Sequence, residues 1–363
     1  MSPAEAEALT GISALAAVRG RAAWALCDGR LGTASKVVGL GQALGLESEL
    51  HAVAPRRLWG MLAPWGPVDP RERIGGGDGR FSPPWPELAL AAGRRTIPYL
   101  RALRRASEGA VFTVLLQNPR TALDVADLVW CPAHDGVGGP NVVTTLTTPH
   151  RMRPDDLARL RVRSADALGD LPSPRVAVCL GGPNGAYRYD AASLNRLAAC
   201  LGALARQGAS FMITPSQRTT GALFAAAAAG TRSARRQVWT RTGPNPYWSF
   251  LARADAVIVT ADSVNMVSEA CVTGRPVLVF EPNGGSAKFE RFHGALREYG
   301  ATRRLTERSD LGETWSYAPL DAAPVIAGEI ARRFMAVRDP RVAERWRRTA
   351  ADAQRRGAHP AAA

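Results

Sequence analysis

The sharpest candidate for chemistry in this 363-residue chain is the polar stretch ADSVNMVSEA, which directly follows the apolar run AVIVT. Asp262 or Ser263 can cap a helix predicted over Val264–Thr273, and the free amides at such a helix start suit a diphosphate. Glu269 lies about two turns along that helix, where a carboxylate can accept hydrogen bonds from ribose hydroxyls. The alternative is an ordinary capped helix with a surface glutamate. The candidate donor-binding residues of this element are Asp262, Ser263, Asn265, Met266 and Glu269.

Two more polar loops follow apolar runs in the same half of the chain. Paired glycines follow the run RVAVCL and open a loop that suits a phosphate or a sugar. Hydroxyls, an amide and a guanidinium follow the run FMI, and all of them can bind a phosphate or a base edge. Because ligands bind at the carboxyl ends of parallel strands, these loops are expected to converge with the first. They add the candidate donor-binding residues Gly181, Gly182, Asn184, Ser216 and Arg218.

A fourth loop, DGRLGT, follows the apolar run AAWALC near the start of the chain. Its Gly29 and Gly32 allow a ligand to approach the backbone closely. The alternative is a tight turn between a strand and a helix, capped by Asp28. The loop does not read G-x-G-x-x-G, and no G-x-x-x-x-G-K-[ST] occurs in the chain. A Rossmann dehydrogenase and a P-loop kinase are therefore both disfavoured.

Short apolar runs alternate with longer Ala- and Leu-rich stretches of helical period, which predicts crossover units and parallel sheets. The predicted strands are Ala22–Cys27, Leu88–Ala91, Val111–Gln117, Leu128–Cys131, Arg175–Leu180, Ser210–Thr214, Ala256–Thr260 and Val277–Glu281. The predicted helices are Ser35–Leu44, Pro98–Ala106, Ala191–Gln207, Gly221–Ala229, Val264–Thr273 and a tail from Pro324 to near Arg355. The expected fold class is α/β, with two Rossmann-like domains.

The length suits two domains at roughly 150 residues each. Prolines and weak apolar patterning place the boundary near Ser164–Pro174. This predicts an N-terminal domain over residues 1–165, a C-terminal domain over 166–323 and a final helical segment over 324–363. The stretch Arg56–Pro86 is rich in proline and glycine yet holds three tryptophans, and loops of this length are usually functional or disordered.

Composition narrows the class of protein. Lysine plus arginine number 46 and aspartate plus glutamate number 32, which gives a formal net charge of +14. Nearly all the basic residues are arginine, which favours phosphate contacts, although codon composition explains the bias equally well. The apolar fraction of 46% excludes a disordered chain. The five scattered cysteines lack the paired spacing of a zinc site and fit a reducing compartment. Neither a metal site nor a separate cofactor is expected.

The chain shows no run of apolar residues long enough to span a bilayer. Its first residues also lack the basic start of a signal peptide. A cytoplasmic location is therefore expected.

The segment SVNMVSEACVTGRPVLVF resembles the element with which glycosyltransferases of the GT-B fold grip a nucleotide sugar. In that family the second domain typically holds the donor through a Gly/Ser-rich helix start, with a glutamate further along for the ribose. The resemblance implies two Rossmann-like domains facing a cleft, and basic groups in place of a metal behind the leaving diphosphate. It also implies that the C-terminal helix crosses back to the N-terminal domain.

A closer resemblance covers nearly the whole chain. It is to bacterial mitochondrial-fission-like proteins, which are related to the plant "elongated mitochondria" fission protein. The segments that carry it are, in order, LCDGRLGTASKVVGLGQALGL, QNPR, PAHDGVGGPNVVTTLTTPHR, GGPNGAYRYD, GPNPYWSFLARADAVIVTADSVNMVSEA, FHGALREYGA and WSYAPLDA. The first loop of that family reads D-G-[KR]-x-G-H-x-x-Q. Here Thr33 stands in place of the histidine and Lys36 in place of the glutamine.

The GT-B resemblance implies that the general base comes from the N-terminal domain, within hydrogen-bond reach of the acceptor hydroxyl. The catalytic candidates at strand ends are Asp28, His134 and Asp135. Arginines near the cleft are expected to neutralise the leaving diphosphate. The candidate acceptor and cleft residues are Gly29, Arg30, Gly32, Asn118, Arg120, Asn141 and His150.

The leading hypothesis is a nucleotide-sugar-dependent glycosyltransferase that acts on a cell-envelope or lipid-linked acceptor. One alternative is a nucleotide-sugar 2-epimerase, which shares the two-domain architecture. Another is a non-catalytic, membrane-associated scaffold that kept the fold and lost the reaction. Nucleic acid is a disfavoured partner, because no helix-turn-helix, zinc-finger or RNA-recognition signature appears.

The irregular stretch Arg56–Pro86 is predicted to attach the protein peripherally to the inner face of a membrane. Tryptophan favours the interface between headgroups and acyl chains. The apolar residues offered for this contact are Trp59, Met61, Leu62 and Trp65. The arginines expected to strengthen it on anionic lipid are Arg56, Arg57, Arg71, Arg73 and Arg80. The alternative is that the tryptophans pack on the core of their own domain.

Overall fold

A computed structural model describes residues 13–75, 80–163 and 171–338. Within these residues the chain forms two units. Unit 1 holds the residues up to Thr145, Pro149–Arg151 and the segment from Ala322, whereas unit 2 holds Leu146–Thr148 and Met152–Asp321. Parts of the sequence predictions lie outside the described residues: the start of the chain, residues 76–79 of the irregular stretch, residues 164–170 of the linker and the tail helix beyond residue 338.

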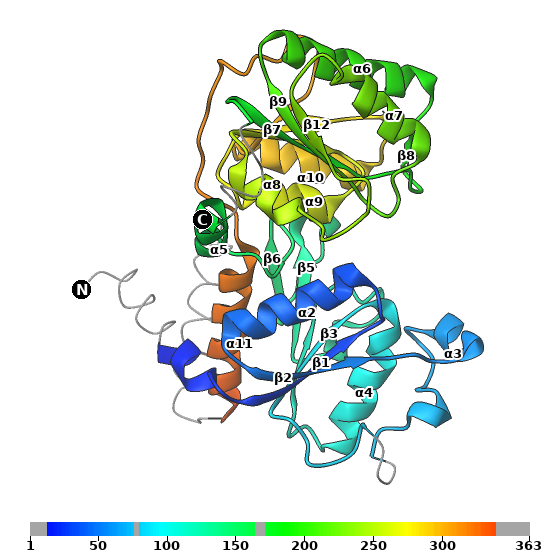
Figure 1. The fold of residues 1–363 in the computed structure, drawn as a ribbon. Helices are drawn as coiled ribbons and strands as arrows, with labels where there is room; N and C mark the ends of the chain where they lie inside the picture. Colours follow the sequence, from blue (N-terminus) through cyan, green and yellow to red (C-terminus); the bar gives the residue numbers. More distant parts are fainter. Residues whose placement is uncertain (1–12, 76–79, 164–170, 339–363) are drawn as a thin grey trace. The chain divides into compact units, whose positions relative to one another are not determined.

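Unit 1 is built on a six-stranded parallel sheet in the order β2-β1-β3-β4-β5-β6 (Figure 1). Both faces of this sheet are covered, so its inner strands are unbroken apolar runs such as the buried LALAA of β3. The edge strand β2, ESELHA, is mostly exposed and polar, and its sequence therefore gives no strand signal. The strands are β1 (Ala22–Cys27), β2 (Glu47–Ala52), β3 (Leu88–Ala92), β4 (Phe112–Leu115), β5 (Leu128–Pro132) and β6 (Val142–Thr145).

The helices of unit 1 cover the two faces of its sheet. Helices α2 (Leu31–Leu44) and α11 (Ala322–Arg338) contact each other and share one core cluster, whereas α4 (Ile97–Ala106) packs into the other. Ile330 and Phe334 of α11 are fully buried, so α11 completes the core of unit 1. The short elements in the loops are α3 (Arg57–Leu62), η1 (Pro70–Glu72), η2 (Arg94–Thr96), η3 (Leu123–Val125) and η4 (Ala133–Asp135).

Unit 2 has a second six-stranded parallel sheet, in the order β10-β9-β7-β11-β12-β14. Its strands are β7 (Arg175–Leu180), β9 (Ser210–Pro215), β10 (Arg236–Val238), β11 (Ala256–Thr260), β12 (Val277–Phe280) and β14 (Thr302–Arg304). A small antiparallel pair joins β8 (Tyr187–Arg188) to β13 (Asn283–Gly284). The helices are α5 (Pro154–Arg163), α6 (Ala191–Arg206), α7 (Gly221–Gly230), α8 (Tyr247–Arg253), α9 (Val264–Cys271) and α10 (Ala287–Glu298).

Alternate residues of the central strand β7 pack into the two hydrophobic clusters of unit 2, one on each face of the sheet. Val176, Val178 and Leu180 pack with residues of α6 and α7, whereas Ala177 and Cys179 pack with residues of α8, α9 and α10. This is the arrangement of a parallel sheet with helices on both faces. The predicted α/β fold class, with two Rossmann-like parallel sheets, is confirmed.

The passage between the two units lies earlier in the chain than the predicted linker. The chain changes unit between residues 145 and 152, and α5 already belongs to unit 2. Leu157 of α5 is buried with Ala252 and Val272, and the Arg161 Nε donates to the Ala252 carbonyl at 2.6 Å. The sequence of α5, PDDLARLRVR, contains few apolar residues, and only Leu157 is buried. It therefore gave no indication that this helix belongs to the second domain.

Two absences hold for the part of the chain that the structure describes. None of the helices in these ranges combines the length and the apolar character needed to cross a membrane. Nor do three or more histidine, cysteine, aspartate or glutamate side chains gather there in a group that could hold a metal ion.

Candidate functional site

The order of the strands in unit 2 reverses between β7 and β11, which are neighbours in the sheet. The chain runs outward from β7 through β9 and β10, and then continues on the other side of β7 through β11, β12 and β14. Ligands of open α/β sheets bind outside the carboxyl ends of the strands at such a reversal. The loops after β7, β9 and β11 follow adjacent strands, so the three polar loops singled out in the sequence meet at this point.

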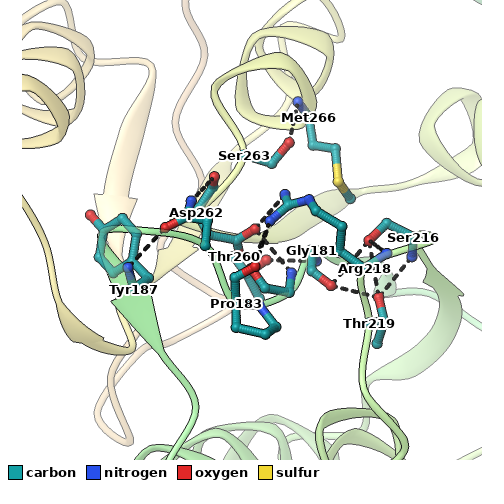
Figure 2. A network of polar contacts seen from close by, with 12 residues as sticks. Gly181, Pro183, Tyr187, Ser216, Arg218, Thr219, Thr260, Asp262, Ser263 and Met266 are labelled. Carbon is teal, nitrogen blue, oxygen red and sulfur yellow. Dashed lines mark hydrogen bonds and ion pairs between the residues drawn. The ribbon is translucent and has the colours of Figure 1, made fainter. Parts of the chain in front are cut away.

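Asp262 ties the three loops together (Figure 2). Its side chain is fully buried. One carboxylate oxygen accepts the Gly182 N–H at 2.9 Å and an Arg218 N–H at 2.7 Å, while the other accepts the Tyr189 hydroxyl at 2.5 Å. Burial, followed by the charge of Asp262, raises the pKa of Tyr189 well above its usual value, so the phenol stays a donor. The Asp262 side chain therefore connects the loops of the site through hydrogen bonds and does not cap α9.

The paired glycines are required by the protein's own atoms. A Cβ on Gly181 would lie 2.2 Å from a carboxylate oxygen of Asp262, and a Cβ on Gly182 would lie 2.1 Å from the backbone oxygen of Arg218. Both distances are far inside van der Waals contact. The sequence analysis predicted that these glycines leave space for a phosphate or a sugar. In the structure, atoms of Asp262 and Arg218 occupy the space beside them.

Asn184 and the loop after β9 lock this arrangement. The Asn184 amide donates to the Asp262 carbonyl at 2.9 Å, and its side-chain oxygen accepts the N–H groups of Ala186 and Tyr187 at 2.8 Å each. Ser216 Oγ donates to the Gly181 carbonyl at 3.1 Å. Arg218 adds a donor to the Gly182 carbonyl at 2.8 Å and keeps 42% of its side chain exposed. Asn184, Ser216 and Arg218 thus shape the site through bonds within the chain.

Helix α9 begins at the same edge. Ser263 is its N-cap and accepts the Met266 N–H, which decides between the two capping residues that the sequence allowed. The Asn265 side-chain oxygen accepts the Thr148 hydroxyl at 3.3 Å, so this residue holds the segment Leu146–Thr148 within unit 2.

Glu269 is held by a tyrosine that the sequence interpretation did not single out. The Tyr247 hydroxyl, at the start of α8, donates to Glu269 Oε2 at 2.8 Å. Burial and then the Glu269 charge raise the pKa of Tyr247 well above its usual value, so this donor persists at any physiological pH. Burial also raises the pKa of the Cys179 thiol, near the end of β7, to about 12, and the Glu269 charge adds to the increase.

Unit 1 has its own reversal of strand order, between β1 and β3, and Asp28 stands at the end of β1. Its side chain is only 5% exposed, and it accepts the Thr33 hydroxyl at 2.7 Å. Gly93, at the end of β3, leaves space for that carboxylate, because a Cβ there would lie 2.5 Å from the Asp28 carboxyl carbon. The Gly93 N–H donates to the side chain of Gln117 at 2.9 Å. Gly29 and Arg30 follow Asp28, Gly32 lies within α2, and Arg30 is 80% exposed.

The two histidines predicted for this unit are buried. His134 lies in η4 after β5, with Nε2 3.9 Å from an Asp135 oxygen. The strands β1 and β5 are separated by β3 and β4, so Asp28 and His134 lie roughly three strand spacings, about 14 Å, apart along the edge. They are thus alternatives for a base rather than a pair. His150 is 2% exposed, and its backbone packs against Gly39 of α2, where a Cβ would lie 2.6 Å away.

Three other predicted cleft residues stabilise loops of unit 1. The Asn141 amide donates to the carbonyls of Leu123 and Ala126 at 2.8 and 3.0 Å. Asn118 accepts the backbone N–H of Arg120 at 2.9 Å, and Arg120 adopts a positive φ of 55°. Arg120 itself is exposed to solvent.

The residues that sequence reasoning missed are Gly93, Gln117, Tyr189 and Tyr247. Gly93 and Gln117 directly follow apolar runs, which is the signal that could have found them. Tyr189 and Tyr247 lie in segments that carried the family resemblance, but single tyrosines have no spacing that marks them as partners of an acid.

Comparison with known proteins places the chain in a family. The family model described as Mitochondrial fission ELM1 matches residues 32–334. This chain belongs to that family. The Mitochondrial fission protein ELM1 of Arabidopsis thaliana is 34% identical over 282 residues, which cover 70% of this chain and 66%, just under two thirds, of the plant protein.

Solved structures agree with the fold. A UDP-GlcNAc 2-epimerase from Methanocaldococcus jannaschii superposes with a TM-score of 0.51 at 10% identity, covering 87% of this chain and 99% of that one. The structure described as a putative UDP-N-acetylglucosamine 2-epimerase from Listeria monocytogenes gives 0.50 at 13% identity, covering 90% and 97%. At these identities the likeness shows the fold alone, which is that of the GT-B-like enzymes.

Proposed function

We propose that this ELM1-family protein binds a nucleotide sugar at the strand reversal of unit 2 and transfers the sugar to a cell-envelope or lipid-linked acceptor. The observation that supports the proposal most directly is the meeting of three polar loops around Asp262. Glu269 lies on α9, the helix that follows the third of these loops. In this proposal the start of α9 and Arg218 receive the diphosphate, and Glu269 receives the ribose. No separate cofactor is required, because amides and guanidinium groups can stabilise the leaving diphosphate.

The donor assignment is tested by isothermal titration of the protein with UDP, GDP and CMP. We expect one of the three to bind, because the site supplies amide donors for the diphosphate and a carboxylate for the ribose. Arg218→Gln should weaken that binding, whereas Arg232→Gln, at an exposed arginine of unit 2 outside the three loops, should leave it unchanged. If none of the nucleotides binds at millimolar concentration, the donor assignment is wrong.

We further propose Asp28 as the general base of the transfer, because it stands at the strand reversal of unit 1. Asp28→Asn should abolish turnover and leave nucleotide affinity intact. The same pattern for His134→Gln, with activity retained in Asp28→Asn, would assign the base to His134 instead.

A nucleotide-sugar 2-epimerase is the second candidate. It is favoured because the two superposed structures are described as UDP-GlcNAc 2-epimerases, one of them as putative. An epimerase needs no acceptor, so incubation with the donor alone separates the two enzymes. An epimerised nucleotide sugar in that reaction would replace the transferase proposal.

A non-catalytic scaffold is the third candidate, and Thr33 favours it. The family's usual histidine is replaced by a threonine whose hydroxyl is bound to Asp28 at 2.7 Å and lies 2.8 Å from the Arg30 carbonyl. Nucleotide binding without turnover of any nucleotide sugar, in the presence of membrane extracts as acceptor, would support this role.

A further inference from the structure

The short helix α3 and the turn after it carry an exposed apolar group that unit 1 does not use in its core. We call this group the α3 tip. Of the nine large hydrophobic residues exposed in the described part of the chain, four lie within this stretch. In Figure 1, α3 stands at the outer edge of unit 1, on the side opposite α11. The α3 tip consists of Leu58, Met61, Leu62 and Trp65, which are 61%, 61%, 44% and 68% exposed.

The backbone beneath the α3 tip is fixed by arginines from η2 and α4. The Nη2 amino group of Arg101 donates to the carbonyls of Pro64, Trp65 and Gly66, which lie 2.6, 3.0 and 2.8 Å away and share its two hydrogens. Arg94 donates to the Gly60 carbonyl at 3.1 Å. These hydrogen bonds fix the backbone that carries the exposed apolar side chains. A single exposed leucine is normal on a protein surface, but four neighbouring exposed apolar residues form a patch.

The stretch of chain that includes the α3 tip, residues 54–75, carries more arginines than acids. The acids between residues 54 and 75 are Asp69 and Glu72, and they pair with Arg56 and Arg80 respectively. Three further arginines of the stretch form no ion pair with a described residue and are exposed: Arg57, Arg71 and Arg73. The local surface therefore combines apolar side chains with unpaired cations.

We propose that the α3 tip docks unit 1 on an anionic lipid surface. The apolar side chains would enter the interface between headgroups and acyl chains, which tryptophan favours, and the three unpaired arginines would face the lipid phosphates. The structure narrows the anchor expected from the sequence. Trp59, one of the four apolar residues offered for the contact, is half-buried. Trp85, which was not among them, packs edge-on against Trp24 in the core, as the alternative predicted for the tryptophans.

Two of the five predicted arginines also leave the anchor. Arg56 donates to both oxygens of Asp69, and Arg80 pairs with Glu72. They hold the stretch together and are not available to lipid phosphates in this arrangement.

The test is co-sedimentation of the full chain with vesicles of phosphatidylcholine alone and of phosphatidylcholine with phosphatidylglycerol, without nucleotide. We expect binding to the anionic vesicles only, weakening as salt rises. Met61→Ser with Trp65→Ser should reduce that affinity by about tenfold or more. The matched control, Val162→Ser with Val337→Ser, removes side chains that are 77% and 71% exposed elsewhere and should bind as wild type does.

A second pair of variants separates local from overall charge. The triple change Arg57→Gln, Arg71→Gln and Arg73→Gln should cost about fivefold in affinity per arginine. The control carries the same loss of charge at three other exposed arginines and should keep most of the affinity: Arg188→Gln, Arg232→Gln and Arg235→Gln. Circular dichroism melting checks that every variant folds.

Three outcomes would overturn the proposal: absence of anionic-vesicle binding, equal binding to neutral vesicles, or equal losses in the variants and their controls. Absence of binding would indicate that the α3 tip serves a protein partner instead. Because nucleotide is left out, the result does not depend on the proposed function.

Discussion

At the scale of single residues, the site in unit 2 is governed by two acids with different surroundings. The Asp262 carboxylate accepts hydrogen bonds from Gly182, Arg218 and Tyr189, and the side chain is fully buried. Glu269 is partly accessible and accepts the hydroxyl of Tyr247. A buried carboxylate with satisfied partners stabilises the loops, whereas an accessible one can still accept further donors.

We therefore expect Tyr247 to act as a positioning residue for Glu269. Tyr247→Phe removes one hydrogen bond to a charged acceptor and should weaken binding of the nucleotide about tenfold. Inorganic diphosphate lacks a ribose, so its affinity should change little. Titration calorimetry with both ligands measures the difference, and Glu269→Ala should show the same pattern with a larger loss. Equal losses for nucleotide and diphosphate would contradict the ribose role.

At the scale of elements, a sequence of this kind predicts buried strands well and edge elements poorly. The central strands of both sheets were predicted because burial on both faces requires unbroken apolar runs. The edge strands β2, β10 and β14 contain charged residues and were missed. The edge strand β6, with the short sequence VVTT, was also missed, as were the helices α5, α8 and α10. Helix α2 begins at Leu31, four residues before its predicted start, because its first turn is made of loop-like Gly and Thr.

The candidate site was predicted in part for the same reason. Loops that follow apolar strands can be located from the sequence, so the three polar loops of unit 2 were found. The partner of each side chain could not be found, because contacts such as Gly182 to Asp262 join residues 80 positions apart.

The glycine loop after β7 gives a prediction at this scale. Gly182→Ala would press a Cβ to 2.1 Å from the Arg218 carbonyl, so unit 2 should lose about 1–3 kcal/mol of its free energy of unfolding. Gly185→Ala, in the same loop, meets no atom within 4 Å and is the matched control. Urea denaturation of both variants measures the difference. Equal stability of the two variants would show that the loop rearranges to accommodate the added methyl group at little cost.

At the scale of the whole molecule, buried histidines couple stability to pH. His293 is 1% exposed, its Nε2 lies 2.9 Å from the Ala261 carbonyl, and burial lowers its pKa. Burial likewise lowers the pKa of His51, partly offset by Glu49. A histidine with a lowered pKa in the folded state takes up its proton more readily when unfolded.

The free energy of unfolding should consequently fall as pH drops below about 6.5, by up to about 1.4 kcal/mol per pH unit for each such histidine. His293→Gln, which keeps an N–H donor for the Ala261 carbonyl and cannot take up a proton, should make this decline shallower. Urea denaturation at a series of pH values between about 5 and 7.5 measures the slope. Parallel pH profiles for the variant and wild type would show that His293 makes no contribution.

The return of α11 to unit 1 has a consequence for biosynthesis. The first strands of unit 1 leave the ribosome long before Ile330 and Phe334, which fill the core between sheet and helices. Unit 2 is encoded between them and has its own cores, so it can fold while unit 1 still lacks a helix. The roughly 190 residues between Thr145 and Arg338 take about 10 to 40 s to synthesise. For that interval the apolar face that α11 will cover is open to other nascent chains and to chaperones, so the half of the protein made first is the half that folds last.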